Sequence, residues 1–177
     1  MIKIFALGEA PHGANLDKIK EILENRDNLS GIFLEHPINY QDSINSYLQN
    51  KKIDEKLQGF WGRCIKEGND IKSVDMYLLD FSFERKIPVV CIDSSKTQTD
   101  EYNKKSDIGH WFLRGESRDE DMFENIVRTY HEEEEWIILC GAGHLITEIH
   151  PRSGKKTLGT RLKERFGENF SYIILGQ

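Results

Sequence analysis

The chain of 177 residues is long enough for one domain with a single sizeable hydrophobic core. Its hydrophobic content of 38% and charged content of 31% are typical of globular proteins, not of disordered or membrane-embedded chains. A net charge of −6 disfavours nucleic acid as a partner, because phosphate binding needs a basic face. No apolar run approaches the ~20 residues of a membrane helix and no signal-peptide pattern opens the chain, so we expect no membrane partner and a cytoplasmic location.

Apolar patterning predicts alternating strands and helices along the chain. Five short runs rich in Ile, Val and Phe have the length of buried strands, at residues 2–7, 31–34, 88–92, 136–140 and 172–175. Between them, apolar residues recur at helical spacing within residues 16–23, 74–81, 122–130 and 158–166. This alternation predicts βαβ units, and therefore an α/β fold with a mainly parallel five-stranded sheet flanked by helices.

One connection is unusually long. The segment 40–86 exceeds the length that a single crossover requires, so we expect two or three extra helices between the second and third strands. The sequence has no internal repeat and no low-complexity linker, and we predict one domain over residues 1–177.

The three cysteines predict a reduced interior without disulfides. None lies in a Cys-x-x-Cys motif, and Cys91 and Cys140 fall inside apolar runs, where a thiol behaves as a small buried hydrophobic group. Cys140 precedes His144 by four residues. Because it lies within a strand rather than on a turn, a role as nucleophile is disfavoured.

Polar groups follow four of the five predicted strands. Glu9 and His12 follow the first, Glu35 and His36 the second, Asp93 the third and His144 the fourth. The carboxyl ends of parallel strands meet at one edge of the sheet, where open α/β sheets bind ligands. We therefore expect these side chains to converge on one pocket. Each also has a structural alternative, since Pro11 and Gly13 fit a simple turn and Asp93 can cap a helix.

Arg118 lies in an acidic segment, residues 116–135, which holds nine carboxylates and two arginines. A solvated helix face is the main interpretation of this segment, and an acidic docking strip is the alternative. We place Arg118 at the first turn of a helix whose apolar stripe begins at Met122, where a cation opposes the helix dipole. The prediction is that it points into the pocket to hold a carboxylate or an anionic ligand. The alternative is a surface ion pair with Asp119 or Asp121.

Two imidazoles with several carboxylates are compatible with two chemistries. Glu9, His12, Glu35 and His144 are candidate ligands for a divalent metal that activates water. Alternatively, His12 can deprotonate water itself, with its basicity set by a neighbouring glutamate. The spacing does not decide between them. The sequence has no His-Glu-x-x-His, Gly-x-Ser-x-Gly, P-loop or dinucleotide motif, so phosphate and NAD binding are disfavoured.

The order of these motifs resembles the superfamily of the erythromycin esterases and the ChaN-like haem-uptake proteins, with TIKI/TraB proteins and a domain of Pasteurella-type toxins as more distant members. The matching features are Gly-Glu-x-x-His-Gly at residues 8–13, Glu35, Asp93, Arg-Asp-x-x-Met-x-x-Asn at 118–125, Gly-x-x-His at 141–144 and a closing helix–strand unit from Thr157. The likeness spans nearly the whole chain.

This resemblance implies a hydrolase of an ester or amide bond, acting on a small molecule or a peptide. His12 would be the base, Glu9 and Glu35 would orient it or hold a metal, and His144 and Arg118 would complete the pocket. The chain is much shorter than the macrolide esterases, so macrolides themselves are not expected. The alternatives are a non-catalytic haem- or metal-binding protein of the ChaN-like type, or a toxin-like accessory module.

Overall fold

The computed structural model describes residues 3–66, 71–95, 110–131, 134–145 and 155–176, with only the backbone of 110–117. Five strands form one sheet in the order β3-β2-β4-β1-β5, and every neighbouring pair is parallel. The strands are β1 (Ile4–Glu9), β2 (Leu29–Pro37), β3 (Val89–Asp93), β4 (Glu135–Gly141) and β5 (Phe170–Leu175). The α/β fold with a parallel five-stranded sheet is thereby confirmed.

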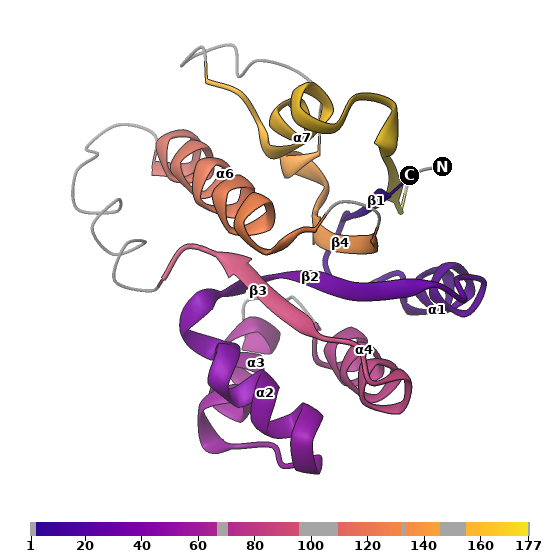
Figure 1. Ribbon diagram of the computed structural model, residues 1–177. Helices are drawn as coiled ribbons and strands as arrows, with labels where there is room; N and C mark the ends of the chain where they lie inside the picture. The colour runs from indigo at the N-terminus through magenta and orange to yellow at the C-terminus, as the bar shows by residue number, and fades with distance from the viewer. Residues whose placement is uncertain (1–2, 67–70, 96–109, 132–133, 146–154, 177) are drawn as a thin grey trace.

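Helices cover both faces of this sheet (Figure 1). One face carries α1 (Leu16–Glu24), α2 (Gln41–Asn50), α3 (Glu55–Lys66) and α4 (Lys72–Arg85), and the other carries α6 (His110–Thr129) and α7 (Leu158–Phe166). Short 3₁₀ helices are η1 (Ile38–Tyr40), η2 (Ala142–His144) and η3 (Gly167–Asn169). The extra helices between the second and third strands are confirmed as α2, α3 and α4. None of the helices in the described ranges is long and apolar enough to cross a bilayer.

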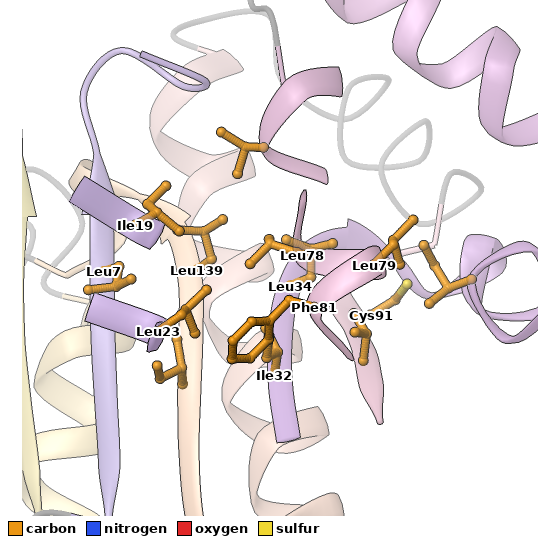
Figure 2. Close-up of a cluster of buried hydrophobic side chains, with 14 of the residues drawn as sticks. Leu7, Ile19, Leu23, Ile32, Leu34, Leu78, Leu79, Phe81, Cys91 and Leu139 are labelled. Carbon is orange, nitrogen blue, oxygen red and sulfur yellow. The ribbon is translucent and has the colours of Figure 1, made fainter. Parts of the chain in front are cut away.

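Alternating side chains along the strands divide the core into two clusters. Leu7 and Leu139 face α1 and α4, whereas Ala6 and Ile138 face α6 and α7. Figure 2 shows the cluster on the face that α1 and α4 cover. Leu7 and Leu139 lie beside Ile19 of α1, and Leu34 lies beside Leu78 of α4. Because β1 to β4 are largely buried on both faces, they appear in the sequence as continuous apolar runs.

The path of the chain creates a crevice at the carboxyl ends of the strands. From β1 to β3 the chain crosses one face of the sheet, and from β3 to β5 it crosses the other. The segments after β1 and β4, two adjacent strands, therefore lead to opposite faces and leave space between them. Glu9 ends β1, Gly141 ends β4, and Glu35 lies on β2 beside β4.

Two details differ from the sequence-based prediction. The helix around Arg118 begins at His110, so Arg118 lies in the middle of α6 and not at its first turn. The prediction was wrong because it took the start of the apolar stripe at Met122 as the guide to the start of the helix, and the helix begins twelve residues earlier. The acidic segment is also not uniformly solvated, since Asp119 is buried while Glu120 is exposed.

Candidate active site

Glu35 is the centre of a buried network of charged groups. Its Oε2 accepts a hydrogen bond from the backbone N–H of Gly141 at 2.6 Å, and its Oε1 accepts one from Arg118 at 2.5 Å. The Nε2 atom of His144 lies 3.3 Å from Oε1. Burial by itself raises the pKa of Glu35, but the charges of His144 and Arg118 hold it well below its ordinary value. Glu35 is therefore a fixed carboxylate.

Arg118 joins this glutamate to a second strand. Its Nε and one terminal nitrogen bind both oxygens of Asp93, at 2.8 and 2.7 Å, and that nitrogen also reaches Glu35. Burial lowers the pKa of Arg118, yet the two carboxylates raise it above its ordinary value. The planar guanidinium thus clamps the ends of β2 and β3 with the geometry that suits carboxylates. Within the described residues, Arg118 thus binds Asp93 and Glu35, whereas the sequence alternative was a surface ion pair with Asp119 or Asp121.

His144 is held between two carboxylates. Its Nδ1 is hydrogen-bonded to Asp119, and its Nε2 faces Glu35. Although burial lowers the pKa of His144, Glu35 and Asp119 together raise it to about 10. At neutral pH the ring is therefore an imidazolium, with both N–H groups directed at acceptors.

Glu9 and His12 form a second, more open pair beside this network. The Nδ1 atom of His12 lies 3.8 Å from Oε2 of Glu9, while Oε1 of Glu9 accepts a hydrogen bond from the backbone N–H of Gly13 at 3.1 Å. The Glu9 side chain is 3% exposed and the His12 side chain is 37% exposed. The pKa of His12 is raised, chiefly by Glu9. Gly13 adopts a φ of +80°, a left-handed conformation that glycine tolerates best.

Gly141 lets His12 approach Glu35. A methyl group added at Gly141 would lie 2.9 Å from Nε2 of His12 and 3.5 Å from Oε2 of Glu35. The imidazole and the carboxylate therefore face one space above the end of β4. Of the five predicted site residues, Glu9, His12 and Glu35 line one cavity, and Arg118 and His144 contact Oε1 of Glu35.

The substitution Gly141→Ala is expected to displace the His12 ring. The backbone of Gly141 is extended, with φ −61° and ψ 141°, so alanine adopts it without strain and the clash with the ring is the main effect. An NMR titration should show changed chemical shifts and a changed pKa for His12. Gly143→Ala is the control, because an added methyl there meets no atom within 4 Å. An unaltered His12 signal in Gly141→Ala would contradict this placement.

Asp119 is the functional residue that sequence reasoning missed. The sequence offers it as part of the Arg-Asp motif and as a surface partner of Arg118, without a role in the pocket, yet it is 5% exposed and holds His144. A signal was present, since Asp119, Met122 and Ile126 recur at helical spacing and so share the face of α6 that packs on the sheet. An acidic residue in an apolar stripe indicates a buried partner.

The same criterion identifies a second buried pair, His36 and Asp75. The Nε2 atom of His36 lies 2.7 Å from Oδ2 of Asp75, which also accepts a hydrogen bond from Trp61 at 2.6 Å. The Nδ1 atom of His36 is 3.0 Å from the backbone oxygen of Glu35. Burial lowers the pKa of His36, but Asp75 raises it above the ordinary value. This pair fixes the segment of β2 that carries Glu35.

The predicted metal site does not fit these contacts. Among the described residues, no group of three or more His, Cys, Asp or Glu side chains is arranged to hold a metal ion. Both nitrogens of His144 already face carboxylates, and Glu35 binds Arg118 and the backbone N–H of Gly141. The contacts of the described residues therefore do not fit a metal centre formed by Glu9, His12, Glu35 and His144.

Comparisons with solved structures show that domains of bacterial toxins have a similar fold. The chain superposes on RRSP, a MARTX toxin effector domain from Vibrio vulnificus, with a TM-score of 0.69 and 15% identity, covering 99% of this chain and 33% of that one. The fold is shared with toxin domains. The C-terminal region of Pasteurella multocida toxin gives a TM-score of 0.67 and 14% identity, covering 97% and 22%. A further bacterial toxin structure gives 0.65 and 16%, covering 98% and 34%.

This chain thus spans about a third or less of the toxin chains that it matches. No family model and no curated protein sequence matches it. The resemblance to erythromycin esterases and ChaN-like proteins was wrong, because the structural likeness over nearly the whole chain is to toxin domains. Short motifs of one Glu or one His at strand ends are too common to assign a family without the fold.

The Pasteurella structure is described as having a thiol-protease-like catalytic triad. In this chain, burial raises the pKa of Cys91 to about 12 and raises that of Cys140 well above its ordinary value. Both thiols are buried within strands. Cys140 lies at the wall of the cavity that Glu9, His12 and Glu35 line, but burial disfavours the thiolate form of both strand cysteines.

Proposed function

We propose that this chain is a toxin-effector-like hydrolase domain that cleaves an amide or ester bond with water activated by His12. The observation that carries the proposal is the shared space above Gly141, with a half-exposed imidazole on one side and a clamped carboxylate on the other. A water molecule there can donate hydrogen bonds to both Nε2 of His12 and Oε2 of Glu35.

His12 is better suited than Glu35 to act as the general base. A general base works best when its pKa lies near the working pH. The pKa of Glu35 is held well below its ordinary value, so this carboxylate accepts a proton poorly. The pKa of His12 is raised from 6.5 by Glu9, which also compensates the charge that the ring gains.

In the proposed reaction, His12 accepts a proton from water and later returns it to the leaving group. His12 takes a proton from water as the water oxygen bonds to the carbonyl carbon, and the carbonyl oxygen gains the negative charge. Both nitrogens of His144 already face carboxylates, but its positive charge acts on His12 and would help to stabilise this oxyanion through space. The bond to the leaving group then breaks, and His12 donates its proton to the departing nitrogen or oxygen.

The proposal is tested with a diverse library of quenched fluorescent peptides and a panel of p-nitrophenyl esters. Wild-type protein should hydrolyse members of one set, and His12→Gln should reduce the rate by roughly 10²–10⁴-fold, the usual contribution of a general base. His131→Gln is the matched control, because that histidine is exposed and lies at the far end of α6. Equal rates in His12→Gln and wild type would contradict the proposal, and absence of all turnover would favour a non-catalytic accessory module.

A further inference from the structure

A cavity of about 130 Å³ continues from the candidate site into the space beneath α3 and α4. Glu9, His12 and Glu35 line the cavity together with apolar side chains that include Leu34, Leu139, Phe60 and Val74. The strand residues Leu34 and Leu139 belong to the core cluster on the α1–α4 face. Glu9, His12 and Glu35 therefore share one cavity with these apolar side chains, and His36 and Asp75 complete its polar wall.

His36 and Asp75, two polar side chains on the cavity wall, are already paired. Both nitrogens of His36 have acceptors, in Asp75 and in the backbone oxygen of Glu35, and Oδ2 of Asp75 also accepts from Trp61. The nitrogens of His36 and Trp61 are therefore occupied and do not select a polar group at this part of the wall. The ring of Phe60 packs edge-on against His36 at 4.7 Å, which fixes one side of the cavity.

The volume sets the size of the group that fits. A cavity of roughly 150 Å³ lined by aliphatic and aromatic side chains binds benzene. The cavity here is close to this size and is formed without a ligand. It suits a branched aliphatic or phenyl group and is too small for an indole together with its backbone.

We propose that this cavity is the specificity subsite, which takes an apolar side chain of Leu or Phe size next to the scissile bond. The inference rests on the proposed hydrolase function and adds the substrate class, a peptide or acylated amine with such a group beside the cleaved carbonyl. The observation that supports this proposal is that His12 and Glu35 line the same cavity as these apolar side chains.

Binding can be tested without turnover. N-acetyl-leucinamide and N-acetyl-glycinamide are titrated into protein with labelled Ile, Leu and Val methyl groups, observed by NMR. We expect saturable shifts of the Leu34, Leu139 and Val74 methyls with the leucine compound and at least a tenfold weaker response with the glycine compound. Equal responses to the two compounds, or none at these methyls, would overturn the inference.

A pair of neighbouring substitutions on α3 supplies the control. Cys64 lines the cavity, whereas Ile65 is 49% exposed. Cys64→Phe should fill the space and abolish the leucine-dependent shifts, and Ile65→Phe should leave them unchanged. If Cys64→Phe is poorly folded, Cys64→Leu should weaken binding by a smaller factor in a folded protein. Retained wild-type shifts in a folded Cys64→Phe protein would contradict the subsite.

Rates of peptide cleavage distinguish a failure of the proposed subsite from a failure of the proposed hydrolase function. Peptides that differ only in Leu, Phe or Gly before the cleaved bond should differ in kcat/KM by at least about tenfold, as expected for an apolar pocket. Cleavage of all three peptides at similar rates would contradict the proposed subsite but not the proposed hydrolase function. Methyl shifts without cleavage of any peptide would remove the hydrolase while leaving the binding site.

Discussion

Replacing Arg118 with methionine is expected to lower the free energy of unfolding by about 3 kcal/mol, at the lower end of the range for breaking a buried ion pair from one side. Methionine fills much of the same volume but leaves Asp93 and Glu35 without their shared cation. Those carboxylates must then be solvated, protonated or moved. Urea denaturation of the two proteins measures the change.

Arg128→Met is the matched control for this effect. Arg128 lies on the same helix, is exposed and donates a hydrogen bond to the side chain of Asn125. Its removal should change stability by less than about 0.5 kcal/mol. Arg118→Lys should fall between the two, because it keeps the charge and loses the two-pronged contact with Asp93. Equal losses in Arg118→Met and Arg128→Met would show that the clamp does not stabilise the fold.

The second large effect is expected from Glu35→Gln, which keeps the shape of the side chain and removes its charge. We predict a loss of hydrolysis of roughly 10²-fold or more, the scale seen when a preorganised charge is removed from an active site. The pKa of His144 should also fall from about 10, because Glu35 is its main charged neighbour. NMR titration of the histidine ring protons measures this shift independently of any substrate.

Glu135→Gln provides the comparison for Glu35→Gln. Glu135 is also a partly buried glutamate paired with an arginine, Arg26, but it lies at the start of β4 at the opposite edge of the sheet. The Glu135→Gln substitution should lower the free energy of unfolding somewhat and leave both the rate of hydrolysis and the pKa of His144 unchanged. A His144 pKa that stays near 10 in Glu35→Gln would contradict the charge network described above.

Local patterning was sufficient to predict the elements of the sheet and the residues at its carboxyl edge. Strands buried on both faces are continuous apolar runs, and parallel strands bring their ends together whatever their order. Glu9, Glu35 and His144 could therefore be assigned to one edge before the strand order was known. The sequence did not specify that order, because β2 and β4 pair across about a hundred residues of chain.

The pairings within the site depended on tertiary contacts that no local pattern encodes. Asp119 and Arg118 are adjacent in sequence but hold different partners, His144 and the Asp93–Glu35 pair. Which of them faces which strand depends on the rotation of α6 over the sheet. The cavity could not be predicted from the sequence either, since it is formed where α3 and α4 meet the strand ends.

The central claim is that His12 acts as the base while His144 remains an imidazolium. The pH dependence of kcat/KM, measured on the best substrate from the screen, tests it most directly. The rate should rise as His12 loses its proton, at a pKa above 6.5, and should fall as His144 loses its proton near pH 10. In His12→Gln the residual rate should lack the rise at low pH. A wild-type rate that is constant from pH 5 to 9, or a rise that persists in His12→Gln, would contradict the mechanism.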